Sequence, residues 1–97
     1  MRVRWSEPAT SELEAIFVYI LERSPKSAEA VARRIIDQAQ SLGEFPLKGE
    51  TTRRTGARKL TVASYPYVII YRVDPTAGEI QILSVRHTAR RQPPAER

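Results

Sequence analysis

The stretch YVIIYRVDPTAGEIQILSVRH, residues 67–87, decides the fold of this chain. Residues 67–73 and 79–87 are rich in β-branched and aromatic side chains, which favour extended backbone. The segment between them, Asp74-Pro75-Thr76-Ala77-Gly78, has the composition of a turn. The stretch therefore predicts two antiparallel strands joined by a short connection.

The second of these strands carries apolar residues on both faces. Ile80 and Ile82 share one face, and Leu83 and Val85 share the other, because successive side chains of a strand alternate. A strand that is covered on both sides lies inside a sheet. We therefore expect residues 79–87 to form a central strand.

Two further strands are predicted outside this pair. RKLTVAS, residues 58–64, precedes it and is separated from it by a turn at Tyr65-Pro66. RVRW, residues 2–5, alternates like a short strand at the start of the chain. The segment EFPLKGETTRRTGA, residues 44–57, is predicted to be a loop from its Pro, Gly, Thr and charge content. The last three strands should form an antiparallel meander.

Two amphipathic helices are predicted before this loop. Ser6 caps the first, with Pro8 in its first turn, and Ser24-Pro25 ends it and starts the second, which stops at Gly43. The first should bury Ala9, Leu13, Ile16, Phe17 and Ile20 and turn Glu12, Glu14 and Glu22 away. The second should bury Ala28, Val31, Ala32, Ile35, Ala39 and Leu42. Their short link makes them an antiparallel hairpin.

These elements predict an α+β fold of order β-α-α-β-β-β, with a helical hairpin packed on one face of a small antiparallel sheet. A chain of 97 residues with 41% hydrophobic composition suits one domain with one core. We take that domain as residues 1–97, and expect the polar, proline-rich residues 91–97 to be a flexible tail.

Composition excludes several classes of site. The chain has no cysteine and one histidine, so neither a disulfide framework nor a metal centre is expected, and nothing indicates a cofactor. No segment approaches the roughly 18 apolar residues of a membrane span. We expect a soluble, cytoplasmic protein without a membrane partner.

Charge is distributed unevenly along the chain. Residues 1–50 hold seven Lys and Arg against eight Asp and Glu, whereas residues 51–97 hold nine against three, so the halves carry −1 and +6. A one-sided basic half indicates an anionic partner, which could be nucleic acid or an acidic protein segment. A merely solubilising surface is the alternative.

The chain as a whole resembles a known family. The collinear set GARKL, YPYVIIYRV and ILSVRHTAR, preceded by SEPATSELEAIFVYI and SPKSAEAVARRIIDQAQSLGEFP, resembles the RelE/ParE toxin superfamily over nearly the whole chain. The match is closest to the ParE-like branch, often labelled plasmid stabilisation proteins. The resemblance implies a type II toxin that forms a hetero-oligomer with a small ParD-like antitoxin. It also implies that the toxin contacts DNA only indirectly, through that antitoxin. It also implies that the N-terminal strand lies beside the last one.

The family contains two chemistries. RelE-like members cut mRNA in the ribosome, which needs an acid, a base and cations, whereas ParE-like members bind and inhibit DNA gyrase. The candidate catalytic residues are His87, Arg86 and Lys48, with Glu50 as another possible second group. Ribonuclease members usually place a tyrosine just after the last strand, where this chain has Thr88. The resemblance therefore favours gyrase inhibition without catalysis, with metal-free mRNA cleavage as the alternative and a plain nucleic-acid-binding module as the third.

Other readings compete at the same residues. His87 could simply be hydrogen-bonded to neighbouring backbone, and Arg58 and Arg72 could pair with Glu79 or Asp74. Three arginines within six residues at the end of the last strand repel one another unless an anion compensates. The candidate target- or anion-binding residues are therefore Arg58, Arg72, Arg86, Arg90 and Arg91.

A second candidate surface is apolar. One helical layer on a sheet leaves the outer groove of the hairpin partly uncovered, and this would suit an amphipathic antitoxin segment. The candidate antitoxin-binding residues are Ile16, Tyr19, Ile20, Val31 and Ile35. For Trp5, Tyr67 and Tyr71, packing in the core is the expected role.

Overall fold

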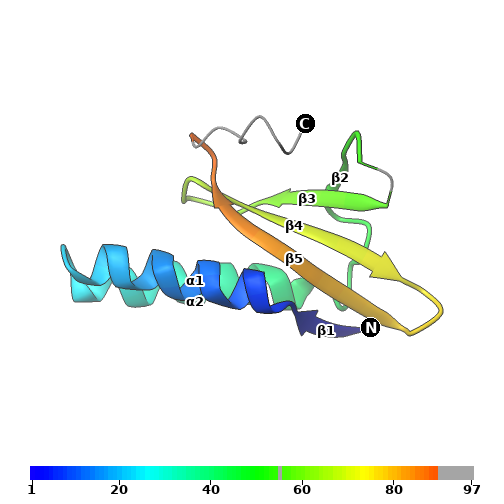
Figure 1. Cartoon of the computed structure of the whole chain (residues 1–97), viewed down its shortest axis with the longest axis horizontal. Coiled ribbons are helices and arrows are strands. Elements are labelled where there is room, and N and C mark those ends of the chain that lie inside the picture. The colour runs from blue at the N-terminus through cyan, green and yellow to red at the C-terminus, as the bar shows by residue number, and fades with distance from the viewer. Residues whose placement is uncertain (55, 90–97) are drawn as a thin grey trace.

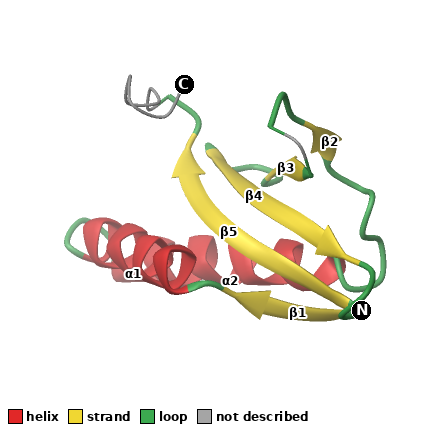
Figure 2. Cartoon of the chain, turned by 45° about the vertical axis from the view of Figure 1, so that its right-hand side comes forward, coloured by secondary structure: helices red, strands yellow, loops and turns green. Residues whose placement is uncertain are grey.

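The computed structural model describes residues 1–54 and 56–89. Its elements are β1 (Arg2–Trp5), α1 (Glu7–Leu21), α2 (Pro25–Ser41), β2 (Glu50–Thr51), β3 (Ala57–Thr61), β4 (Tyr67–Asp74) and β5 (Glu79–His87). Figure 1 shows the two helices side by side as a hairpin, and Figure 2 shows them against one side of a twisted sheet. The predicted α+β architecture is confirmed. The predicted tail, residues 91–97, lies outside the described residues.

The sheet has the strand order β1-β5-β4-β3-β2. The N-terminal strand lies beside the last one, as expected, with Val3 opposite Ile80 and Trp5 opposite Ile82. This pair is parallel while the other pairs are antiparallel, so the sheet is mixed rather than wholly antiparallel. A parallel neighbour is possible here because the helical hairpin supplies the long crossover that parallel pairing requires. The two-residue strand β2 lies within the segment that the sequence predicts as a loop.

A β-bulge interrupts the pairing of β4 with β5. Ile70 is opposite Ser84, but the next residue, Tyr71, is opposite Ile82. Leu83 is therefore an extra residue without a partner in the register. Strict alternation of side chains fails at this point.

The bulge changes which face of the sheet receives Val85. Val85 is opposite Ile69, and Ile69 shares a face with Tyr71, the residue opposite Ile82. Val85, Ile82 and Ile80 thus all face the helices, and their exposed fractions are 2%, 0% and 0%. β5 is central, as predicted, but the prediction that it buries apolar residues on both faces is wrong. Within the described residues, both helices pack on the first face, and none covers the second (Figure 2).

The helices begin at the predicted caps. The hydroxyl oxygens of Ser6 and Ser24 accept hydrogen bonds from Ala9 N and Ser27 N, each at 3.2 Å. Burial differs between the two helices, since α2 contributes more buried residues than α1. Only Ala9 of α1 is fully buried, with Leu13, Ile16 and Ile20 at the border of the core. The buried residues of α2 and its C-cap are Ala28, Val31, Ile35, Ala39 and Leu42.

The prediction that Glu12 faces away from the core is wrong. Its carboxylate accepts hydrogen bonds from Ser84 Oγ at 2.8 Å and from Val85 N at 2.9 Å. Beyond the end of β1, the outer edge of β5 has no neighbouring strand, so its backbone needs other partners. Glu12 supplies one partner, and the Ser6 hydroxyl supplies another by donating to Leu83 O at 3.2 Å. These contacts tie α1 to β5.

In the part of the chain that the structure describes, no helix has the length and apolar composition that a membrane crossing requires.

Candidate functional site

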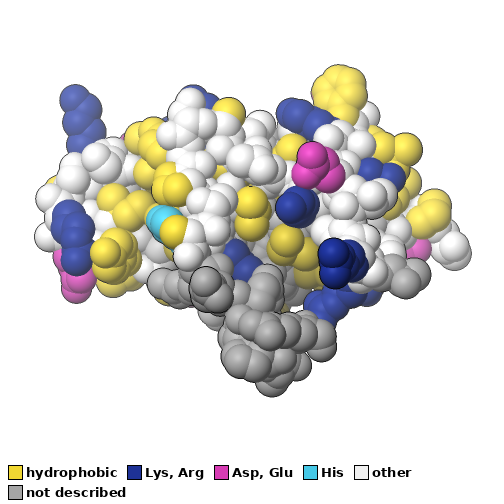
Figure 3. All heavy atoms as spheres, turned by 90° about the horizontal axis from the view of Figure 1, so that it is seen from above, with side chains coloured by type: hydrophobic (Ala, Val, Ile, Leu, Met, Phe, Trp, Pro, Cys, Tyr) yellow, Lys and Arg dark blue, Asp and Glu magenta, His cyan; other side chains and the backbone are white. Residues whose placement is uncertain are grey.

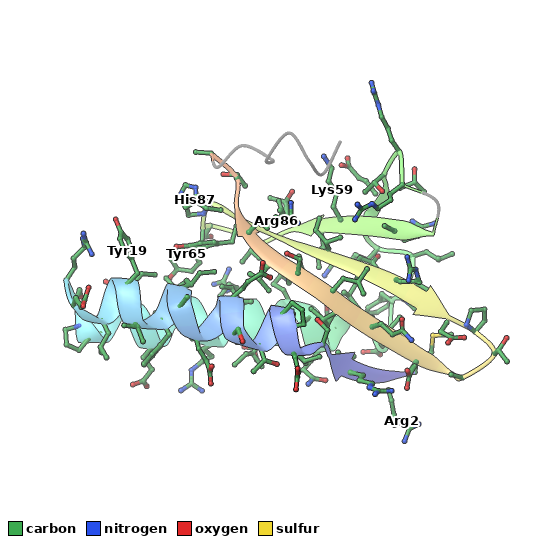
Figure 4. The ribbon with its side chains drawn as sticks, viewed as in Figure 1. Arg2, Tyr19, Lys59, Tyr65, Arg86 and His87 are labelled. Carbon is green, nitrogen blue, oxygen red and sulfur yellow. The ribbon has the colours of Figure 1, made fainter. Side chains whose placement is uncertain are left out.

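The candidate acid or base and the candidate cation beside it lie on opposite faces of the sheet. His87 is opposite Tyr67, on the helix side, and the two rings meet edge to face with centroids 5.3 Å apart. Arg86 lies on the other face, where its Nε donates to Ser84 Oγ at 3.0 Å. Figure 4 shows both side chains near the end of β5.

The imidazole of His87 already has a backbone partner. Its Nδ1 accepts a hydrogen bond from Ala89 N at 3.0 Å, so only Nε2 remains for another group. This contact is the one expected of a histidine that orders the end of a strand. No cluster of three or more His, Cys, Asp or Glu side chains that could hold a metal ion occurs in residues 1–54 and 56–89.

Lys48, the third candidate catalytic residue, lies at a different place in the molecule. Its Nζ is 3.5 Å from Ser41 Oγ, at the C-terminal end of α2. The loop that carries it contacts Tyr71, four residues along β4 from Tyr67, a separation of roughly 13 Å along a strand. His87, Arg86 and Lys48 therefore do not assemble into one site. Glu50 is opposite Lys59 in β2 and β3, also remote from His87 in the sheet.

The sequence suggests that Arg58 binds the target or an anion. In the structure, its guanidinium group binds the protein's own backbone. Arg58 is opposite Tyr71 and so faces the helix side. Its Nη1 donates to Gly49 O at 2.7 Å and lies 3.5 Å from Leu47 O. Arg58 therefore holds the loop after α2.

Among the described strand residues, the cations that face away from the helices include Lys59, Arg72 and Arg86. Arg2 and Arg4 of the edge strand β1 share this side, beside Glu79. Lys59 is opposite Ile70, and Arg86 is opposite Val68, so aliphatic side chains separate the charges. We call this set the open face: Lys59, Val68, Ile70, Arg72 and Arg86. Figure 3 looks down from the side of β2 and β3 and shows Lys and Arg groups beside exposed apolar side chains. Arg90 and Arg91, which the sequence adds to this set, lie outside the described residues.

The acids on this side of the sheet include Glu50, opposite Lys59, and Glu79, which is paired in register with Arg2. Glu79, the predicted partner of Arg58 or Arg72, is instead 3.6 Å from Arg4 and 4.0 Å from Arg2. Within the described residues, Lys59 and Arg72 form no ion pair within 4.0 Å. An anionic partner could therefore use these charges.

The structure corrects the predicted antitoxin-binding set. Val31 and Ile35 are 5% and 0% exposed and belong to the core, so a partner cannot contact them while the protein is folded. Ile16 and Ile20 are half-buried, and only Tyr19, at 57%, is well exposed. The apolar stripe of an amphipathic helix does not identify the partner-binding residues here, because that stripe packs against the protein's own sheet.

Other exposed apolar residues were missed. Val18, Tyr19 and Leu21 at the C-terminal end of α1 are 39–57% exposed, and we call them the hairpin patch. Ile36, in the second half of α2, is 40% exposed. The sequence did contain a signal, since AIFVYIL, residues 15–21, is apolar all round the helix and needs more cover than one sheet gives. Phe45 and Leu47, in the loop after α2, are 56% and 66% exposed.

Comparison with known proteins gives a consistent family. Residues 3–92 match the family model described as the ParE toxin of the type II toxin-antitoxin system parDE. The chain is 34% identical over 92 residues to Y4kP of Sinorhizobium fredii, which is named as a toxin, covering 95% of this chain and 93% of that protein. It is 39% identical over 89 residues to toxin RelE2 of Caulobacter vibrioides, covering 92% and 97%.

Solved structures show the same fold. The chromosomal ParDE toxin-antitoxin system of P. aeruginosa contains a chain with a TM-score of 0.81 and 27% identity, covering 90% of this chain and 95% of that one. The toxin-antitoxin complex RelBE2 of Mycobacterium tuberculosis gives 0.64 and 26%, with 92% of each chain covered.

The helical hairpin on a five-stranded mixed sheet is thus the fold of type II toxins of the ParE/RelE class. Within that class, this chain belongs to the ParE toxin family.

Proposed function

We propose that this toxin arrests growth by binding DNA gyrase, without catalysis of its own. The observation that carries this proposal is the separation of His87 from the open face. Cleavage of RNA requires proton-transfer groups beside the cations that stabilise the transition state. Among the described residues, no strand position on the side of the sheet that carries the open face holds a histidine or a tyrosine, and the candidate second group Glu50, opposite Lys59, is remote from His87.

The composition of the open face supports a protein target. Lys59 and Arg72 are separated by Ile70, which is half-buried and presents an apolar surface between two charges. Such a mixture suits an acidic protein surface, where apolar contact adds to charge complementarity. These cations would then steer the encounter and orient the complex.

The hairpin patch supports a ParD-like antitoxin as the neutralising partner. Val18, Tyr19 and Leu21 offer apolar surface at one end of the helical hairpin, which suits the apolar face of a partner helix. The solved relatives named above are toxin-antitoxin assemblies. The predominantly basic second half of the chain favours an acidic antitoxin segment.

The test compares two activities of the same purified toxin. We expect inhibition of DNA supercoiling by gyrase and no cleavage of mRNA in a reconstituted translation mixture. Antitoxin expressed from the adjacent reading frame should relieve the inhibition. Cleavage without any effect on gyrase would instead assign this chain the activity of the RelE-like branch.

A further inference from the structure

The loop between α2 and β2 is held in one conformation from inside the protein. Tyr71, which is 0% exposed, donates its hydroxyl to Pro46 O at 2.9 Å and accepts from Gly49 N at 2.9 Å. Arg58 adds its 2.7 Å hydrogen bond to Gly49 O. Gly49 itself leaves no room for a side chain, because an added Cβ would lie 2.6 Å from Lys59 O. Residues 44–49 are therefore a preorganised loop.

This loop displays two large apolar side chains to solvent. Leu47, at 66%, is the most exposed large apolar residue among those described, and Phe45 is 56% exposed. Neither side chain belongs to the core. A fixed loop loses little conformational entropy on binding, so its exposed apolar side chains are suited to act as anchors. Phe45 and Leu47 form what we call the apolar knob.

Basic residues surround the apolar knob in sequence. Apart from Arg58, which is bound to carbonyls of the loop, residues 44–59 contain four Lys and Arg against two Glu. Lys48 lies inside the loop, Arg53 and Arg54 follow β2, and Lys59 is opposite Glu50. Within the described part of the chain, none of these four cations forms an ion pair. The complementary surface is therefore apolar at its centre and acidic at its rim.

The apolar knob could be covered by the folded target protein or by a segment of the antitoxin, and its shape favours the target. A projecting side chain is buried fully only in a pocket of its partner. A folded protein offers pockets, whereas a single helix or extended segment is itself convex and offers none. The hairpin patch, at the opposite end of the helices in Figure 1, already suits an antitoxin helix.

We propose that Phe45 and Leu47 anchor the toxin in an apolar pocket with an acidic rim on its folded target protein. This inference rests on the proposed function insofar as the toxin acts by binding. It adds a contact that is separate from the antitoxin-binding patch.

The test is a pair of double variants of the full-length toxin. Phe45→Ala with Leu47→Ala removes the apolar knob, and Val18→Ala with Tyr19→Ala is the matched control on the hairpin patch. Growth arrest after induction without antitoxin, affinity for purified gyrase and co-purification with the antitoxin are measured for each. The knob variant should lose growth arrest and about tenfold or more in gyrase affinity while retaining the antitoxin. The control should retain growth arrest and lose antitoxin.

Each other outcome has a defined meaning. A knob variant that arrests growth like the wild type overturns the inference, as does one that loses the antitoxin as well. A wild-type dimer that becomes monomeric in the knob variant would assign the knob to a second copy of the chain. If wild-type toxin does not bind gyrase but the knob variant still loses growth arrest, the inference stands and the gyrase proposal fails. Should the double variant unfold, Leu47→Gln alone carries the test, because its side chain is outside the core.

Discussion

His87 and Arg86 are adjacent in β5, and their side chains leave the sheet on opposite faces. The alternation of a strand makes this separation obligatory once the register of β5 with β4 is set. Proximity in sequence therefore gives no reason to expect cooperation between this imidazole and this guanidinium.

His87→Gln should leave growth arrest within about threefold of the wild type, because a catalytic proton-transfer group would contribute roughly 10²-fold or more. Arg72→Ala with Arg86→Ala should abolish growth arrest, since it removes two cations of the open face. Arg33→Ala, which removes an exposed cation paired with Glu29 on α2, is the matched control. Arrest on induced expression is the measurement, with circular dichroism to verify folding. A harmless His87→Gln variant beside a toxic double-arginine variant would reverse the assignment.

Glu12→Ala should lower the free energy of unfolding by about 1–3 kcal/mol, because Val85 N and the Ser84 hydroxyl lose their acceptor in a partly buried place. Glu14→Ala, at the exposed position two residues later, should change it by less than about 0.5 kcal/mol. Urea denaturation of both variants measures the difference. Equal stabilities would show that solvent replaces the Glu12 carboxylate without cost.

Tyr71→Phe should loosen the loop of residues 44–49 without emptying the core, because only the hydroxyl is removed. Gly49 N loses its acceptor, so its amide should exchange with solvent faster, and stability should fall by about 1–3 kcal/mol. Tyr19→Phe, at an exposed position, is the control. If exchange at Gly49 is unchanged, Arg58 alone is sufficient to hold the loop.

Association with the antitoxin should slow as salt rises, because the Debye length falls from about 10 Å at 0.1 M to about 3 Å at 1 M. Tyr19→Ala should mainly raise the dissociation rate, since it removes apolar contact rather than long-range charge. Surface-immobilised antitoxin and a salt series separate the two rates. An association rate that is independent of salt would contradict the charge-steering argument.

The elements of this fold could be predicted from local patterns, since caps, turns and runs of β-branched residues depend on near neighbours. Ser6 and Ser24 cap the helices as expected. The face of Val85 could not be predicted, because a period of two assumes regular pairing and the bulge at Leu83 depends on the partner strand.

The candidate site was predicted less well for a related reason. A sequence shows which helical face is apolar, but Val31 and Ile35 are apolar because the protein's own sheet covers them. Arg58 likewise adds to the net charge counted from the sequence but not to the charge of the open face. Its guanidinium group contacts two carbonyl oxygens of the preceding loop. Net charge and periodicity predict an anion-binding surface and an apolar surface, and burial limits which of the predicted residues a partner can reach.

The parallel pairing of β1 with β5 also bears on how the protein is made. Among the strands of residues 1–54 and 56–89, β1 has β5 as its one neighbour, and its partners are residues 79–82. Contacts between residues so distant in sequence form slowly, because the loop that joins them must close first. Residues 2–5 must therefore wait unpaired until residues 79–82 have been synthesised and have left the ribosome.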